Sequence, residues 1–167
     1  VTKQFSIQTR SSGIELTLSY DPVSFSSLEI EKPTVFVMVD KPKISQVLRN
    51  PLSNAFKFSP AGSEVKIKVK LIEKTTAEQD FAVFARIEVR DNGAGISQEN
   101  LNKLFASIIQ FNSAGLQAGG GSGIGLFVSK GIMDLHGGAI GAKSGGEGKG
   151  STFFIDVPLV SEVKAGT

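Results

Sequence analysis

The uneven placement of glycine constrains this chain more than any other feature of its sequence. Of its 19 glycines, all but Gly13, Gly62 and Gly166 lie between Gly93 and Gly150. No G-x-y period runs through that region, which excludes a collagen-like helix. Since 40% of the 167 residues are apolar, the chain can bury a core as one domain. We therefore expect ordinary strands and helices in the first half and several glycine-rich loops in the second.

Charge and residue usage exclude several classes of protein. With 18 basic and 16 acidic residues, the net charge of +2 gives no reason to expect nucleic acid or direct membrane contact. The absence of cysteine excludes disulfides and thiolate zinc sites, and the single His136 excludes a multi-histidine metal site. Because the sequence has neither an apolar run of about 18 residues nor an N-terminal signal core, we expect a soluble, cytoplasmic domain.

Apolar periodicity predicts an α+β two-layer sandwich. The expected sheet is mixed but largely antiparallel, has about five strands, and is covered on one face by three helices. In the strand at 64–71, Val65 and Ile67 are expected to face the core, and Lys66, Lys68 and Lys70 are expected to face water. Strands are predicted at 14–20, 35–39, 64–71, 81–89, 139–143 and 151–157, and helices at about 40–58, 98–105 and 124–135.

The first helix carries a polar face of unusual composition. Asn50, Asn54, Lys57 and Phe58 are spaced i, i+4, i+7 and i+8, so they share one side of the helix. Amide oxygens can ligate Mg²⁺ and a lysine can pair with phosphate, although an ordinary polar surface helix has the same pattern. Pro51 removes one backbone donor from this helix and predicts a kink, at a cost of roughly 3 kcal/mol unless accommodated.

Two glycine clusters lie at strand boundaries. In D-N-G-A-G-I, at 91–96, the Asp91 carboxylate could accept a hydrogen bond from an exocyclic amine. Gly93 and Gly95 would let a ligand ring approach the backbone, while a tight turn is the alternative. In G-K-G-S-T-F-F, at 148–154, the simplest interpretation is a hairpin turn that enters a strand.

A third glycine cluster, G-G-G-S-G-I-G-L at 119–126, runs directly into a helix. Backbone N–H groups at such a helix start can bind phosphate. The dinucleotide-binding G-x-G-x-x-G pattern fails here because Leu126 follows Gly121 and Gly123. The P-loop pattern fails at Gly148-Lys149, because Lys143 occupies the position of its first glycine. A flexible linker would explain the glycines but not the start of the helix.

Taken together, the four clusters resemble the ATP-binding catalytic domain of histidine kinases. This domain has the Bergerat fold, which is shared with gyrase B-type topoisomerases and mismatch-repair ATPases. The resemblance covers about residues 10–160, so 1–9 would be the rest of a linker to absent dimerisation helices and 161–167 a tail. It rests on an N-box (50–58), three glycine boxes (91–96, 121–126 and 148–153), a phenylalanine-box region (104–111) and L-H-G-G at 135–138.

The resemblance implies roles for the residues that match it. Asn54 would ligate Mg²⁺, Asn50 would support the metal or the phosphates, and Lys57 would reach phosphate oxygens, which makes these three the expected catalytic residues. Asp91 would accept from the adenine N6 amine and so select ATP over GTP. The residues expected to contact the nucleoside are Phe58, Gly93, Gly95, Ile96, Phe105 and, through water, Ser151. The residues expected to end a mobile ATP lid at 106–120 and to face the phosphates are Gly121, Ser122, Gly123, Ile124, Gly125 and Leu126.

The implied function is that of a sensor histidine kinase of the hybrid type, whose parent protein could be anchored in a membrane. The domain would bind Mg-ATP and transfer the γ-phosphoryl group to a histidine on a separate dimerisation domain, which in turn serves a response regulator receiver domain. It is expected to be monomeric, because dimerisation belongs to the other domain. His136 lacks the acidic neighbour of a phosphoacceptor, so we expect it to be structural.

Two alternatives remain open at this stage. A nucleotide sensor or pseudokinase would bind ATP without transfer. Pro51 and Ile108 favour it, because the family usually has an apolar residue and an aromatic residue at these places. A stand-alone ATPase would need a general base, and Asn50 stands where hydrolysing relatives have glutamate, which speaks against it.

Overall fold

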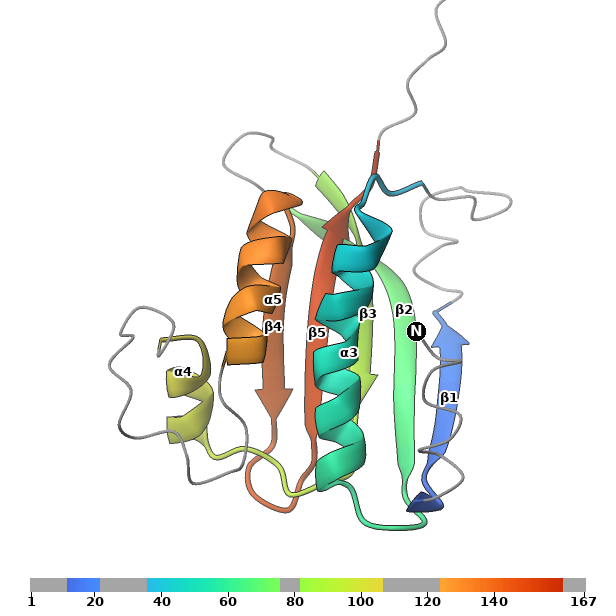
Figure 1. The fold of residues 1–167 in the computed structure, drawn as a ribbon, viewed down its shortest axis with the longest axis vertical. Coiled ribbons are helices and arrows are strands. Elements are labelled where there is room, and N and C mark those ends of the chain that lie inside the picture. Colours follow the sequence, from blue (N-terminus) through green and yellow to red (C-terminus); the bar gives the residue numbers. More distant parts are fainter. Residues whose placement is uncertain (1–11, 22–35, 76–81, 107–123, 161–167) are drawn as a thin grey trace, which may run out of the picture.

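The computed structural model describes residues 12–21, 36–75, 82–106 and 124–160, and within these ranges it forms one five-stranded sheet with helices (Figure 1). The strand order is β1-β2-β3-β5-β4; β1 runs parallel to β2, and the other neighbours are antiparallel. The elements in chain order are β1 (Glu15–Tyr20), α3 (Lys41–Phe58), β2 (Glu64–Lys74), β3 (Ala82–Arg90), α4 (Gln98–Ala106), α5 (Ile124–Leu135), β4 (Ala139–Ser144) and β5 (Ser151–Pro158).

Helices α3 and α5 lie side by side on one face of the sheet, and α4 lies near the β4 edge (Figure 1). The predicted α+β class, with a mixed and largely antiparallel sheet, is therefore confirmed. The strand predicted at 81–89 corresponds to β3, which is central because it pairs with both β2 and β5. In the described part of the chain, no helix is both long enough and apolar enough to cross a bilayer.

The core lies between this face and the two helices. On α3, Leu52 and Ala55 are buried against Val65 and Ile67 of β2, as the alternating pattern predicted. A neighbouring cluster joins α3 to α5 and β5 and consists of Ile44, Val47, Ile132, Met133, Ile155 and Val157. Burying an aliphatic side chain of this kind contributes roughly 1.5–3 kcal/mol to folding, so these contacts fix α3 and α5 on the sheet.

Helix α3 begins where the sequence predicts and continues through its proline. The Asp40 side chain caps it by accepting a hydrogen bond of 3.0 Å from Lys43 N. Pro51 is buried within α3 and cannot donate to the carbonyl of Val47, yet the helix extends to Phe58. The N-box face is therefore carried by one uninterrupted helix.

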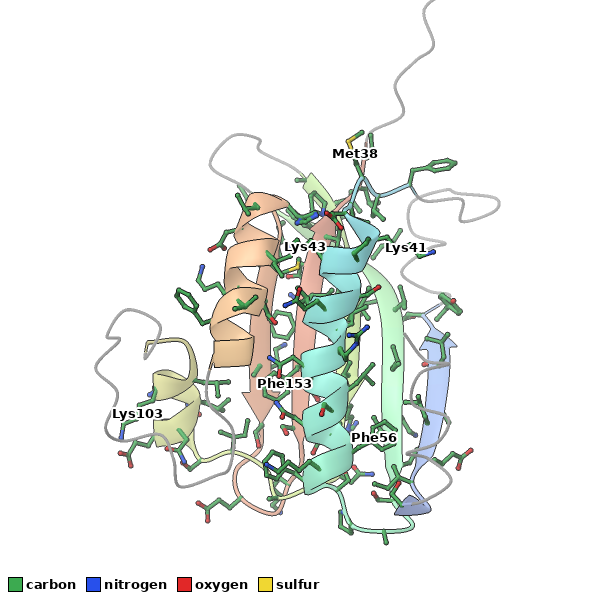
Figure 2. The ribbon with its side chains drawn as sticks, viewed as in Figure 1. Met38, Lys41, Lys43, Phe56, Lys103 and Phe153 are labelled. Carbon is green, nitrogen blue, oxygen red and sulfur yellow. The ribbon has the colours of Figure 1, made fainter. Side chains whose placement is uncertain are left out.

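The predicted strand at 35–39 is wrong, because the described residues 36–40 form no strand. Phe36 O accepts a hydrogen bond of 2.9 Å from Val160 N, but this contact does not extend into strand pairing. The central strands β3 and β5 are already paired on both sides, so this apolar run has no free edge to join there. Phe36, Val37 and Met38 stay exposed instead, with Met38 at the outer end of the molecule (Figure 2), while Val39 is half-buried against the core.

The opposite face of the sheet carries ion pairs. Lys66, Lys68 and Lys70 were expected to face water, and each pairs with a carboxylate there: the partners are Glu64, Asp21 and Glu88, at 2.9, 2.8 and 2.7 Å. Asp156, on β5, is fully buried on this face, which no pattern in the sequence predicted.

Asp156 is held in place by two cations from neighbouring strands. Arg86 donates to it from two nitrogens, at 2.6 and 2.8 Å, and Lys74 donates to it as well. Burial on its own raises the pKa of Asp156, but the hydrogen bonds from Arg86 and Lys74 outweigh it, so this pKa lies below its ordinary value. The carboxylate is therefore charged inside the sheet.

Candidate functional site

Asp91, the first residue after β3, forms the centre of the site. It is 5% exposed. Its Oδ1 accepts hydrogen bonds from Gly93 N at 2.8 Å and Ser151 N at 3.2 Å, and its Oδ2 accepts one from Ser151 Oγ at 2.8 Å. A carboxylate offers about four acceptor positions, so roughly one is left for an outside donor. The structure thus brings Asp91 and Ser151 together, as the resemblance implied.

The glycines around Asp91 permit close packing of backbone on backbone. A Cβ on Gly93 would lie 2.5 Å from Phe58 O, and a Cβ on Gly95, whose φ is +71°, would lie 2.1 Å from Gly146 O. A Cβ on Gly150 would lie 2.2 Å from Asp91 O. No side chain fits at these distances. These glycines are therefore required by the protein's own packing, in addition to the predicted opening for a ligand ring.

Ser144 joins the first and third glycine boxes, which the sequence analysis missed. Its Oγ accepts from Ile96 N at 3.0 Å and Gly146 N at 3.2 Å, and donates to Gly150 O at 2.6 Å. Its position directly before the Gly145-Gly146 turn was the available signal, since serine commonly bonds to turn backbone. The hydroxyl holds the β4–β5 turn against the segment at 93–96 that carries the predicted base-lining residues.

The N-box amides meet the start of α5. Asn54 Nδ2 donates to Asn50 Oδ1 at 3.5 Å, so the two amides lie together in spite of Pro51 between them. A Cβ on Gly125 would lie 3.0 Å from Asn50 Nδ2, which shows how closely the first turn of α5 approaches Asn50. The N-box and the second glycine box are thus in contact, as expected for parts of one site.

The C-terminal end of α3 presents a cation and an aromatic ring to solvent. The Lys57 ammonium lies 5.1 Å from the centroid of the Phe58 ring, and Phe58 is 46% exposed. The carbonyl of Phe58 lies against Gly93, so this end of α3 adjoins the Asp91 turn. Within the described ranges, no three His, Asp or Glu side chains gather into a metal-binding group.

Several predicted residues lie outside the described part of the chain. These are Gly121, Ser122 and Gly123, together with the expected lid at 106–120 apart from Ala106, which ends α4. The side chains of Phe105 and Ile124 also lie outside it, as do Ile108 and the segments at 1–9 and 161–167. Leu126 is half-buried on α5. The roles of these residues therefore stay predictions.

Both ring nitrogens of the single histidine are bound to backbone. His136 Nε2 accepts from Asp40 N at 3.1 Å, and Nδ1 lies 2.7 Å from Ile132 O, to which it donates in this tautomer. These bonds join the start of α3 to the end of α5. They are consistent with the structural role that the sequence predicted for His136.

Comparison with known sequences gives one consistent group of relatives. The family model described as histidine kinase-, DNA gyrase B- and HSP90-like ATPase matches residues 39–161. The chain is 36% identical over 128 residues to the sensor histidine kinase WalK of Bacillus subtilis, a match that covers 77% of this chain and 20% of that protein. It is 34% identical over 127 residues to the autoinducer 2 sensor kinase/phosphatase LuxQ of Vibrio harveyi, covering 76% and 14%. The chain therefore spans at most about a fifth of these relatives.

Solved structures share the fold. The nucleotide-free catalytic domain of the histidine kinase ThkA aligns with a TM-score of 0.65 at 22% identity, over 93% of this chain and 86% of that one. Full-length ShkA, solved in complex with AMPPNP, aligns with a TM-score of 0.65 at 23% identity, over 95% and 28%. These likenesses confirm the predicted fold.

Proposed function

Because this chain belongs to the family of histidine kinase-, DNA gyrase B- and HSP90-like ATPases, we propose that it is the ATP-binding catalytic domain of a sensor histidine kinase. It binds Mg-ATP and transfers the γ-phosphoryl group to a histidine on a dimerisation domain, from which a response regulator receives it. The relatives WalK and LuxQ, both named as sensor kinases, support this proposal. The domain works on the cytoplasmic side, whether or not the parent protein is anchored in a membrane.

The observation that carries the proposal is the partly filled carboxylate of Asp91. Three donors from Gly93 and Ser151 hold it in one orientation, and about one acceptor position remains. An adenine N6 amine donates there, whereas guanine would present a carbonyl to the same carboxylate. Because Asp91 is 5% exposed, a bound base that did not donate to it would shield the open acceptor position from water. That position would then have no hydrogen-bond partner, which costs binding free energy. The site therefore selects ATP over GTP.

The phosphate end of the nucleotide lies at Asn50, Asn54 and the start of α5. Mg²⁺ is commonly held by one or two protein oxygens together with phosphate oxygens, and the Asn54 amide suits such a site. When bound, the ion neutralises charge on the β- and γ-phosphoryl oxygens. Asn50 orients Asn54 through their 3.5 Å hydrogen bond, and Lys57 supplies a further cation from the same helix.

The chain's own residues act by positioning. Asn50 has no proton-accepting group with a useful pKa, so it does not activate water as a general base. The ring nitrogens of His136 are both bound to backbone, so the nucleophilic imidazole comes from the other domain. In such a transfer, most of the rate enhancement comes from aligning the imidazole with the γ-phosphorus and from neutralising the phosphoryl charge.

The test is transfer of label from γ-³²P-ATP to the histidine-containing dimerisation domain of the same parent protein. We expect acid-labile phosphohistidine on that domain with the native chain, and at least about a hundredfold slower labelling with Asn54→Ala. Gln46→Ala is the matched control, because Gln46 is an exposed amide on the same helix.

The alternatives give different results in the same assay. ATP binding without any labelled histidine would identify a nucleotide sensor. Steady release of phosphate without the second domain would identify a stand-alone ATPase. Either result would overturn the proposal of a histidine kinase.

A further inference from the structure

A basic hollow of about 180 Å³ lies where the ends of β3, β5 and β4 meet, and Arg90, Lys143, Lys149 and Thr152 are among its lining residues. Asp91 and Ser151 also border it. None of the four residues belongs to the nucleotide site proposed above. We refer to these four residues and the space between them as the basic hollow.

The register of the sheet places the basic hollow on the face that α3 and α5 leave uncovered. Thr152 is the direct partner of Arg90 on β3 and of Lys143 on β4, and direct partners project from the same face. The preceding residue of β3, Val89, points the other way and is buried in the core beneath α3. Arg90 and Lys143 therefore flank Thr152 on the open face, on two strands that are each about 4.8 Å from β5.

The third cation comes from the β4–β5 turn. A Cβ on Gly145 would lie 3.3 Å from the Cβ of Lys149, so the Lys149 stem lies close over Gly145 at the rim of the hollow. The turn itself is fixed by the hydrogen bonds of Ser144 to Gly146 and Gly150. Lys149 is thus attached to an ordered turn, and its charge is added to those of Arg90 and Lys143.

The charges of the basic hollow are not neutralised by neighbouring carboxylates. In the described part of the chain, the other five cations of this face are paired: Lys66, Lys68, Lys70, Lys74 and Arg86. No such pair is found there for Arg90, Lys143 or Lys149. The Asp91 carboxylate, which borders the hollow, accepts from Gly93 and Ser151 and forms no ion pair with these cations. Three like charges around one small space repel each other, and a bound anion relieves that repulsion.

We propose that the basic hollow binds a phosphoryl oxyanion. Arg90 offers a planar fork of donors, the two lysines add ammonium groups, and Thr152 adds a hydroxyl, which together suit an anion with several oxygen atoms. The space is large enough for one phosphate group. The hollow adjoins the nucleotide site at Asp91 and Ser151, which border both. Its cations, by contrast, come from residues to which we assign no nucleotide contact. The proposal stands independently of the proposed function.

The test follows backbone amide resonances of the ¹⁵N-labelled chain during a titration with sodium phosphate, with chloride adjusted to keep the ionic strength constant. We expect saturable shifts at Gly145, Lys149 and Thr152. The double variant Lys143→Gln/Lys149→Gln should weaken phosphate binding at least about tenfold, since it removes two charge-assisted contacts. Lys68→Gln is the matched control, because it removes a partly exposed lysine of the same face that pairs with Asp21 and lies opposite Glu88, and it should leave the affinity unchanged.

Runs with and without saturating AMPPNP separate this site from the nucleotide site. Phosphate-dependent shifts at 144–152 in both runs support phosphate binding in the basic hollow, whether or not AMPPNP is bound. A phosphoserine peptide, compared with its unmodified form, forms a second arm. Tighter binding of the peptide than of phosphate would identify a protein-borne phosphoryl group as the ligand, and weaker binding would identify the free ion.

The proposal would be overturned by the absence of saturable shifts at 144–152, or by shifts confined to the Asn50 and Asn54 side-chain amides. Equal affinity of the double variant and the native chain would also overturn it. The native titration maps the site without any substitution, so the test does not depend on the folding of the variant.

Discussion

The hydroxyl of Ser151 donates a hydrogen bond of 2.8 Å to the carboxylate of Asp91, 60 positions earlier in the chain. Asp91 N in turn donates to Ser151 O at 2.9 Å. The two hydrogen bonds thus join the end of β3 to the start of β5 beside the Asp91 carboxylate, which we assign as the acceptor for adenine.

Replacing Ser151 tests this arrangement. In Ser151→Ala, the carboxylate loses one of three donors and is less firmly oriented, so Mg-ATP should bind about five- to tenfold more weakly, as expected for loss of a hydrogen bond to a charged group. Ser151→Thr keeps the hydroxyl and should bind nearly as the native chain does. Titration calorimetry measures both. An unchanged dissociation constant for Ser151→Ala would contradict the role of the hydroxyl.

Gly125→Ala tests the contact between α5 and the N-box. The new methyl group would lie 3.0 Å from Asn50 Nδ2, so the amide has to move and the Asn50–Asn54 pair is disturbed. We expect weaker Mg-ATP binding and slower phosphotransfer, with little change in the free energy of unfolding.

The matched control is Gly131→Ala, on the same helix. A Cβ at Gly131 meets nothing within 4 Å, and alanine is favoured over glycine in a helix by about 1 kcal/mol. This variant should be somewhat more stable and fully active. Equal activity of both variants would show that Asn50 tolerates the methyl group.

Asp156→Asn tests the buried charge. Because the pKa of Asp156 is lower in the folded chain than the unfolded value of about 3.9, the unfolded state binds the proton first as pH falls. The stabilisation is therefore complete above about pH 5 and is lost as pH falls through the unfolded pKa towards the folded one.

Urea unfolding between pH 7 and pH 3 measures this effect. At pH 7, Asp156→Asn should lower the free energy of unfolding by about 3 kcal/mol, because Arg86 and Lys74 lose their charged partner. Between about pH 5 and pH 3, the free energy of unfolding of the variant should fall less steeply than that of the native chain. The control Asp134→Asn removes an exposed i,i+4 pair with Lys130 and should cost less than about 1 kcal/mol. An unaltered acid profile in Asp156→Asn would contradict the account.

The sequence predicted most of the fold because the relevant signals are local. The alternation of Val65 and Ile67 with lysines placed the core face of β2, and Asp40 predicted the start of α3 through its capping bond with Lys43. The run at 35–39 was assigned wrongly because strand formation also needs a free sheet edge, which only the topology reveals.

The site shows the same division between local and long-range information. The spacing of Asn50 and Asn54 predicted their shared face, and the structure brings them together. The hydrogen bonds of Ser144, the burial of Asp156 and the approach of Gly125 to Asn50 connect residues that are distant in sequence, so no local pattern predicts them.

His136→Ala separates structure from chemistry. It removes hydrogen bonds to Asp40 N and Ile132 O and should lower the free energy of unfolding by about 1–2 kcal/mol. Phosphotransfer per folded molecule should be unchanged, since the acceptor is on another domain. Phosphate found on His136 by mass spectrometry would contradict this assignment.

The most direct test of the central claim is calorimetric titration of Mg-ATP into the native chain and into Asp91→Asn, with thermal melting used to confirm that the variant is folded. The amide replaces one acceptor oxygen of the site with a donor, which conflicts with the adenine amine. We predict at least about tenfold weaker ATP binding in Asp91→Asn, and weaker binding of GTP than of ATP to the native chain. Equal dissociation constants for ATP in the two proteins would contradict the assignment of Asp91 to adenine.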